Sequence, residues 1–248
     1  MDFSRFKTFI FDLDGTIWNW QKLYPGVKKT IQRLKSKSKQ VLFLTNNSVL
    51  SRQGLTRKLR RFGLDVQQED LITSSWVAAQ YLKKRNASAF AIGNGLKEEL
   101  VKAGIRITDK NPDYLVVGQD QQFNMQKLAK AYEILQGRTK LLAVAAGRVW
   151  YMGKKLVPAT GPILAAVEFV SGKKAVFVGK PSDEMANAVK SVVKAKKEET
   201  AIFGDECSAD IGMGKKLGYF TVLVRTGIDK RCNIATDAVI ASIAEVEV

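Results

Sequence analysis

The alternation of short apolar runs with helical segments constrains the fold of this chain more than any other feature. Most of the runs are separated by segments of roughly 10 to 15 residues whose apolar positions recur at helical spacing, as in residues 27–34. Strands that are apolar throughout and are linked by helices are typical of parallel sheets covered on both faces. We therefore predict an α/β fold with a doubly wound, Rossmann-like parallel sheet. The predicted strands are residues 8–11, 41–44, 89–92, 114–117, 141–145, 175–178, 201–203, 220–224 and 238–241.

Four of these runs end in polar residues that could share one site. Asp12 follows the first run, Thr45 the second, and Lys180 and Asp205 each follow a later run after one glycine. In an open parallel sheet, ligands bind beyond the carboxyl ends of the strands. A turn would explain any one of these residues, but it explains the whole set poorly.

Asp12 and Asp14 stand one residue apart in the stretch FIFDLDGTIW. Two close carboxylates repel each other, so they need a cation or a proton. Asp205 and Asp210 can add two more carboxylates, and Mg²⁺ prefers a few such oxygen ligands together with water and a phosphate oxygen. We expect Asp12, Asp14, Asp205 and Asp210 to form a Mg²⁺ site. For Asp210, a helix N-terminal acid favoured by the helix dipole is the alternative.

The same residues favour phosphoryl chemistry. Asp12 can act as a nucleophile that forms an aspartyl-phosphate, and Asp14 can protonate the leaving oxygen and later activate water. Lys180, Thr45 and Asn46 can hold the charged oxygens of the substrate phosphate. For Thr45 and Asn46, capping of the next helix is the alternative.

Composition excludes several other classes of protein. The chain has no histidine, which removes histidine-based triads and histidine-ligated zinc. Cys207 and Cys232 lack a metal-ligand spacing, and we interpret them as incidental thiols. The net charge of +16 is scattered along the chain, which favours solvated helix faces over a nucleic-acid site. No apolar run approaches the roughly 20 residues that span a bilayer, and no signal peptide precedes the first run, so we expect a cytoplasmic protein that binds neither nucleic acid nor membrane.

Taken in order, four motifs resemble those of the haloacid dehalogenase-like (HAD) phosphatases. They are DLDGT at 12–16, TNNS at 45–48, GKPS at 179–182 and GDECSAD at 204–210. Trp18, the pair Pro25–Gly26 and LTNNS at 44–48 are similar to the NagD-like subgroup, which includes phosphoglycolate, pyridoxal-phosphate and 4-nitrophenyl-phosphate phosphatases. The resemblance covers essentially the whole chain.

The resemblance also implies an α/β cap domain inserted between the second and third motifs. We expect a catalytic core of residues 1–78 and 176–248 and a cap of residues 79–175, in which NPDYLVVG at 111–118 is similar to a cap strand of the subgroup. The cap segment carries 16 basic and 7 acidic residues. Pairing of two copies through their caps is a further expectation from this resemblance.

The chain departs from the subgroup at two positions. Residues 145–148 read AAGR where NagD-like proteins commonly have a T-N-P-D type of stretch, which puts the choice of substrate in doubt. Ala209 stands where a threonine usually precedes the last acid.

We thus predict a Mg²⁺-dependent phosphomonoester hydrolase that acts on a small phosphorylated metabolite such as a sugar phosphate, phosphoglycolate, a nucleotide monophosphate or an ester like 4-nitrophenyl phosphate. The alternatives are a phosphotransferase or mutase, and a non-catalytic protein of the same fold that binds a phosphorylated ligand.

Overall fold

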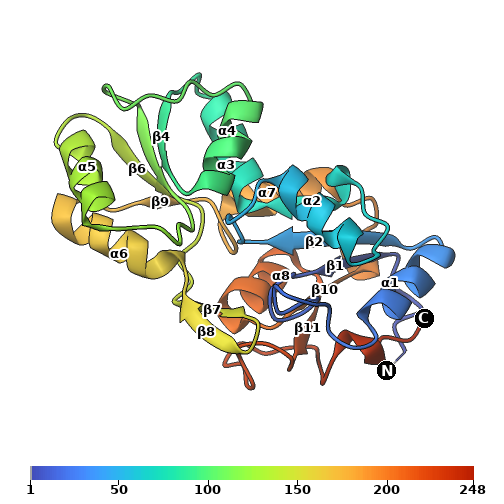
Figure 1. The fold of residues 1–248 in the computed structure, drawn as a ribbon. Helices are drawn as coiled ribbons and strands as arrows, with labels where there is room; N and C mark the ends of the chain where they lie inside the picture. Colours follow the sequence, from blue (N-terminus) through green and yellow to red (C-terminus); the bar gives the residue numbers. More distant parts are fainter. Residues whose placement is uncertain (1) are drawn as a thin grey trace.

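The computed structural model describes residues 2–248 and contains two parallel sheets and one hairpin (Figure 1). The larger sheet has six strands in the order β12-β11-β10-β1-β2-β3, and every neighbouring pair is parallel. Its strands are β1 (Thr8–Phe11), β2 (Gln40–Thr45), β3 (Leu71–Thr73), β10 (Thr200–Gly204), β11 (Phe220–Val224) and β12 (Ala238–Ile240).

Successive side chains of these strands point to opposite faces of the sheet. Phe9 and Phe11 of β1 pack against α1 (Val27–Ser36) and α2 (Arg52–Arg61), whereas Ile10 packs against helices on the other face. That second face is covered by α3 (Ser74–Lys83), α7 (Asp183–Val192) and α8 (Gly212–Leu217). The strands are buried on both faces, which explains why they read as unbroken apolar runs. The predicted α/β class is confirmed.

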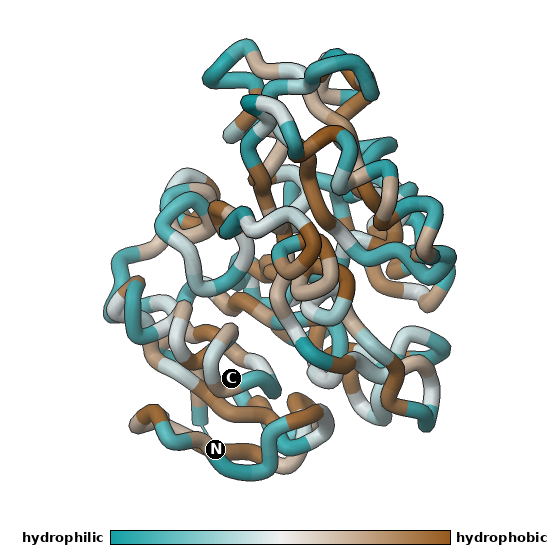
Figure 2. The backbone as a smooth tube through the Cα atoms, turned by 90° about the vertical axis from the view of Figure 1, so that its left-hand side faces the viewer, coloured by the Kyte–Doolittle hydropathy of each residue, from teal (hydrophilic) through white to brown (hydrophobic). Residues whose placement is uncertain are grey.

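The smaller sheet has four parallel strands in the order β4-β5-β6-β9. Its strands are β4 (Ala89–Ile92), β5 (Tyr114–Val117), β6 (Lys140–Ala143) and β9 (Val176–Phe177), and its helices are α4 (Asn94–Lys102), α5 (Met125–Leu135) and α6 (Thr160–Ser171). One apolar cluster contains Ile10 and Leu42 of the larger sheet together with Val116 and Leu142 of the smaller one. The hydrophobic segments accordingly run through the middle of the molecule in Figure 2.

An antiparallel hairpin, β7 (Val149–Met152) and β8 (Lys155–Pro158), lies in sequence between β6 and β9 of the smaller sheet. Its turn contains Gly153, whose backbone N–H donates to the carbonyl of Asn19, 2.9 Å away. The hairpin thereby contacts the loop that follows β1, although the two are more than a hundred residues apart in sequence. This contact brings the hairpin to the carboxyl ends of the strands of the larger sheet.

Most predicted strands coincide with observed ones to within two residues, and those at 8–11, 89–92, 114–117 and 220–224 match fully. The sequence analysis missed β3 and both hairpin strands. The run at 175–178 also belongs to the smaller sheet, because β9 pairs with β6. The helix α3 runs across residue 78. The division into a core and a cap at residues 78/79 and 175/176 stays a prediction.

Among residues 2–248, no helix combines the length and the apolar character needed to span a bilayer.

Candidate active site

Acidic side chains from three segments meet at the carboxyl edge of the larger sheet. Asp12 directly follows β1, Asp205 follows β10, and Asp210 lies in a short π-helical turn, Cys207–Ile211. One oxygen from each carboxylate lies within 4.8 Å of the others, and all three residues are buried. The predicted metal ligands Asp12, Asp205 and Asp210 are thus brought together by the fold.

Lys180 inserts its ammonium group between two of these acids. Its Nζ lies 2.5 Å from Asp12 Oδ1 and 2.6 Å from Asp210 Oδ1, and it also donates to the carbonyl of Leu44 at 3.0 Å. Burial alone would lower the pKa of Lys180, but the charges of Asp12 and Asp210 raise it well above its usual value. Lys180 is therefore a permanent cation of the site. It arrives on the segment after β9, from the side of the smaller sheet.

Three carboxylates facing one ammonium group leave two negative charges without a partner. Burial, together with the neighbouring carboxylates, raises the pKa of Asp12 and of Asp205 well above the usual range despite the charge of Lys180. The site therefore binds either protons or a further cation. A hard divalent ion with oxygen ligands matches both the charge and the donor atoms, so the residues present fit such a metal.

The carboxylate of Asp205 is fixed by its surroundings. Its Oδ2 accepts from the backbone N–H of Ile228 at 2.7 Å, and its Oδ1 accepts from Thr16 Oγ1 at 3.3 Å. Gly15, with φ of +86°, and Gly227 approach it so closely that a Cβ on either would lie 2.3 Å or 1.8 Å from Asp205 Oδ2. Only glycine leaves room for the acid at these two positions.

Asp14 lies apart from the three-carboxylate group, and both of its oxygens are occupied. Trp18 Nε1 donates to Oδ1 and Asn47 Nδ2 donates to Oδ2, each at 2.9 Å. Burial raises the pKa of Asp14 from 3.8 to about 6, although both donors act in the opposite direction. A carboxyl group with this pKa can both give and accept a proton near neutral pH. Its predicted role as a metal ligand stays a prediction.

Thr45 and Asn46 occupy different positions relative to the site. Thr45 is buried at the end of β2, and its Oγ1 accepts from the backbone N–H of Asn47 at 3.0 Å. The Asn46 side chain bonds both backbone groups of Lys180, with its Oδ1 accepting at 2.8 Å and its Nδ2 donating at 3.3 Å. Asn46 thus fixes the segment that carries the lysine. Contact of either residue with a substrate phosphate stays a prediction.

A cavity of about 410 Å³ opens over these residues. One side of it, the catalytic wall, is formed by Asp12, Asp14, Thr45, Lys180, Asp205 and Glu206. A second part of the lining, the hairpin wall, is formed by residues 145–151, which include the start of β7. The volume suits a small molecule.

Two polar residues that line the cavity were not predicted from the sequence. Asn47 belongs to the quoted TNNS motif, and its position two residues after Thr45 could have indicated that its side chain also reaches the strand end. Glu206 lines the cavity directly after Asp205, and burial, followed by the charge of Asp210, raises its pKa from 4.5 to about 7. No sequence pattern distinguished Glu206 from an ordinary loop acid.

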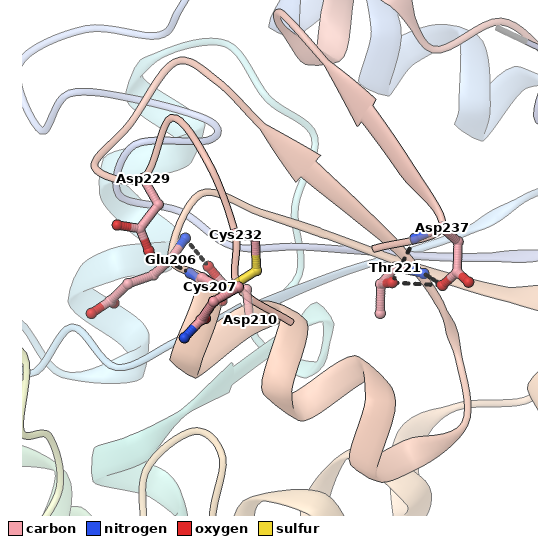
Figure 3. Close-up of a disulfide and its surroundings, with 8 residues drawn as sticks. Glu206, Cys207, Asp210, Thr221, Asp229, Cys232 and Asp237 are labelled. Carbon is pink, nitrogen blue, oxygen red and sulfur yellow. Dashed lines mark hydrogen bonds between the residues drawn. A yellow bond between two sulfur atoms is a disulfide. The ribbon is translucent and has the colours of Figure 1, made fainter. Parts of the chain in front are cut away.

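The interpretation of the two cysteines as incidental thiols is wrong. Cys207 and Cys232 form a disulfide whose Cα atoms lie 5.3 Å apart (Figure 3). The bond links the turn that carries Asp210 to the loop after β11, and the backbone N–H of Cys207 donates to Asp229 in that same loop at 2.7 Å. Spacing alone could not reveal the pair, because 25 residues separate the two cysteines in sequence.

Comparison with known proteins identifies the family. The model of the haloacid dehalogenase-like hydrolases matches residues 9–106, and a second model, described as HAD-hydrolase-like, matches residues 177–246. The ribonucleotide monophosphatase NagD of Escherichia coli K12 is 30% identical over 249 residues, which cover 98% of each chain. The chain belongs to the haloacid dehalogenase-like hydrolases.

Other HAD relatives place the chain in the NagD-like subgroup. The dihydroxyacetone phosphatase of Corynebacterium glutamicum (strain R) is 28% identical, with 92% of this chain and 84% of the relative covered. The solved structure of a p-nitrophenyl phosphatase from Archaeoglobus fulgidus superposes with a TM-score of 0.87 at 30% identity, over 96% of this chain and 97% of that one. The protein is a HAD phosphatase, and its three-carboxylate group is where a divalent metal of this family would bind.

Proposed function

We propose that the protein is a Mg²⁺-dependent phosphomonoester hydrolase that uses Asp12 as its nucleophile. The observation that carries this proposal is the pairing of Asp12 with Lys180 inside a group of three buried carboxylates on the wall of a small-molecule cavity. A structural ion pair would not need two further buried carboxylates, which leave negative charge that the single ammonium group of Lys180 cannot neutralise.

In the first step, Asp12 attacks the phosphorus atom of the ester. A bond forms between the Asp12 oxygen and phosphorus while the bond from phosphorus to the leaving oxygen breaks, and Asp14 gives that oxygen a proton. Lys180 stabilises the negative charge on the transferring group. The product of this step is an alcohol and an aspartyl-phosphate on Asp12.

In the second step, water regenerates the enzyme. Asp14, now ionised, accepts a proton from water, the water oxygen bonds to phosphorus, and the bond from phosphorus to Asp12 breaks. Asp12, Asp205 and Asp210 would hold the Mg²⁺ ion, which when bound neutralises charge on the phosphate oxygens.

We infer that the substrate is a small phosphorylated metabolite. The relatives include phosphatases named for dihydroxyacetone phosphate-type and ribonucleotide substrates and for p-nitrophenyl phosphate. The cavity of about 410 Å³ has room for esters of this size. We also propose that residues 79–175 form a cap that closes the site from water.

The decisive experiment measures phosphate release from a panel of esters with either Mg²⁺ or EDTA present. The panel contains 4-nitrophenyl phosphate, phosphoglycolate, pyridoxal phosphate, triose phosphates and nucleoside monophosphates. We expect turnover that EDTA abolishes and that Asp12→Asn lowers at least about 1000-fold. Asp65→Asn is the matched control, because the Asp65 side chain is 80% exposed and far from the three acids in sequence.

A second variant tests the covalent intermediate. In Asp14→Asn, transfer from the reactive 4-nitrophenyl ester proceeds while water activation is lost, so the labelled phosphoryl group accumulates on the protein and is absent from the double variant with Asp12→Asn. Transfer of the group to an added alcohol would instead support a phosphotransferase or mutase. Metal-dependent binding of phosphate esters without any turnover would support a non-catalytic binding protein.

A further inference from the structure

Asp14 is held by a tryptophan whose role packing alone does not explain. Trp18 is completely buried, and Nε1, the only polar atom of its side chain, donates to Asp14 Oδ1 at 2.9 Å. Asn47, on the segment after β2, occupies the other oxygen at the same distance. A carboxyl group held at both oxygens keeps one orientation, which proton transfer to a leaving oxygen requires.

Trp18 is in turn the inner end of a row of three indole rings. The ring centroids of Trp18 and Trp20 lie 5.8 Å apart and those of Trp20 and Trp150 lie 5.2 Å apart, both with edge-to-face geometry. Such pairs attract each other beyond the simple burial of their surfaces. Lys58 Nζ lies 4.0 Å from the Trp20 ring centroid and adds a cation–π contact.

The outer end of this row belongs to the hairpin. Trp150 is part of β7, and the hairpin turn is joined to the loop after β1 by the bond from Gly153 to Asn19. The tryptophan row therefore connects the hairpin wall of the cavity to the carboxyl group on its catalytic wall. Trp20 itself does not line the cavity, whereas Trp150 does.

We propose that Trp18 is a positioning residue for Asp14, and that the β7–β8 hairpin holds Trp18 in place through Trp150 and Trp20. This inference rests on the proposed hydrolase function, in which Asp14 protonates the leaving oxygen. The hairpin that lines the cavity thereby also helps to orient the proton donor.

Two esters of similar shape separate positioning of the acid from a general structural role. Phenyl phosphate has a basic leaving oxygen that needs a proton, whereas 4-nitrophenyl phosphate has a leaving oxygen that departs without one. The value of kcat/KM reports only the steps up to formation of the aspartyl-phosphate. Loss of orientation at Asp14 therefore lowers kcat/KM for phenyl phosphate and spares 4-nitrophenyl phosphate.

The first variant is Trp18→Phe, which keeps an aromatic ring and removes the N–H donor. General acid catalysis contributes about 100-fold or more, and loss of one of two holding bonds removes part of it. We expect kcat/KM for phenyl phosphate to fall about 10-fold and that for 4-nitrophenyl phosphate to change less than about twofold. The matched control is Trp76→Phe, because Trp76 lies in α3 and packs against Arg52.

The second variant, Trp20→Ala, interrupts the row without removing a group that lines the cavity. It should produce the same preference for 4-nitrophenyl phosphate, with a loss of about threefold for phenyl phosphate. Trp76→Ala is its control.

If Trp18→Phe lowers kcat/KM equally for both esters, or lowers it for neither, the proposal is overturned and Trp18 is a packing residue. An unchanged ester ratio in Trp20→Ala would overturn the part played by the hairpin. If the native protein releases phosphate from neither ester with Mg²⁺ present, the proposed function has failed, which is a different result from either of these.

Discussion

The two walls of the cavity are built in opposite ways. On the catalytic wall three charged side chains have partners within the protein: Lys180 bonds two acids, Asp205 accepts two donors, and Asp14 is held at both oxygens. On the hairpin wall, residues 145–147 are two alanines and a glycine, and the exposed side chain of Arg148 forms no ion pair with any residue in 2–248. The first wall is organised before a substrate binds, whereas the second offers a free cation.

This difference assigns different tasks to the two walls. Preorganised charges stabilise a transition state because they need no rearrangement during the reaction. A surface without internal partners can instead pair with groups that differ from one substrate to another. We therefore expect changes on the catalytic wall to lower turnover for every ester, and changes on the hairpin wall to alter the ranking of esters.

The largest effect should follow from Lys180→Met. This variant removes the cation between Asp12 and Asp210 while it keeps a side chain of similar length, and turnover should fall about 100- to 1000-fold for all esters because the charge on the transferring group loses its partner. Steady-state kinetics across the panel measure this effect. Lys190→Met is the control, since Lys190 is an exposed lysine of the helix that follows. A loss confined to one ester would contradict the assigned task of the catalytic wall.

The second largest effect should be a loss of folding stability when the disulfide is removed. The double variant Cys207→Ser, Cys232→Ser frees a 25-residue loop, and we expect a loss of about 3 kcal/mol in the free energy of unfolding. For a chain of this size that corresponds to a decrease in Tm of about 6–12 °C. Calorimetry of the native protein with and without a dithiol reductant provides the comparison. Because the bond anchors the turn that bears Asp210, the Mg²⁺ concentration for half-maximal activity should also rise, and an unchanged metal requirement would show that the turn keeps its structure without the bond.

The half-buried acid Glu206 should make the metal-free protein sensitive to pH. Its pKa is raised to about 7 by burial and then by Asp210, so the folded state holds this proton more tightly than the unfolded state. The stabilisation of the folded state by this bound proton is fully present below pH 4.5, the ordinary pKa of a glutamate side chain. It is lost as the pH rises through about 7. In EDTA, Glu206→Gln should therefore exceed the native protein in stability by about 2–3 kcal/mol at pH 8 and match it at pH 4.5.

Thermal unfolding of both proteins across this pH range, with Glu198→Gln as an exposed control, tests the prediction. A constant difference between native and Glu206→Gln at all pH values would mean that Glu206 does not titrate in this window.

The same contrast explains what could be predicted from the sequence. The long apolar runs gave the strands, because strands buried on both faces contain few polar residues. The acids at strand ends gave the three-carboxylate group, because parallel strands place their carboxyl ends on one edge. These features depend on local pattern and on one topological rule.

The missed features depend on contacts between distant segments. The disulfide requires the π-helical turn at residues 207–211 to meet the loop at 225–233, and the bond from Trp18 to Asp14 depends on the path of a single loop. The hairpin did have a local signal, since VWYM and KLVP flank the two residues Gly153 and Lys154. The hairpin follows directly after residues 145–148, where the chain departs from the NagD-like pattern.

The smallest expected effect is on substrate choice, through Arg148→Ala. A free guanidinium on the rim of the cavity should pair with a second anionic group on the leaving alcohol, such as the carboxylate of phosphoglycolate. Because Arg148 is exposed, the pair is worth only about 1 kcal/mol, so kcat/KM for phosphoglycolate should fall about fivefold while that for 4-nitrophenyl phosphate stays within about twofold.

Arg148→Lys and Lys154→Ala complete this test. Arg148→Lys keeps the charge and should retain part of the preference for phosphoglycolate. Lys154 is an exposed cation of the hairpin turn, and its removal should leave the ranking of esters unchanged. Equal losses in Arg148→Ala and Lys154→Ala would point to a diffuse attraction by the basic surface instead of a pair, and this attraction would weaken with added salt for every anionic ester. A loss specific to Arg148 and to the carboxylate-bearing ester would locate substrate choice on the hairpin wall.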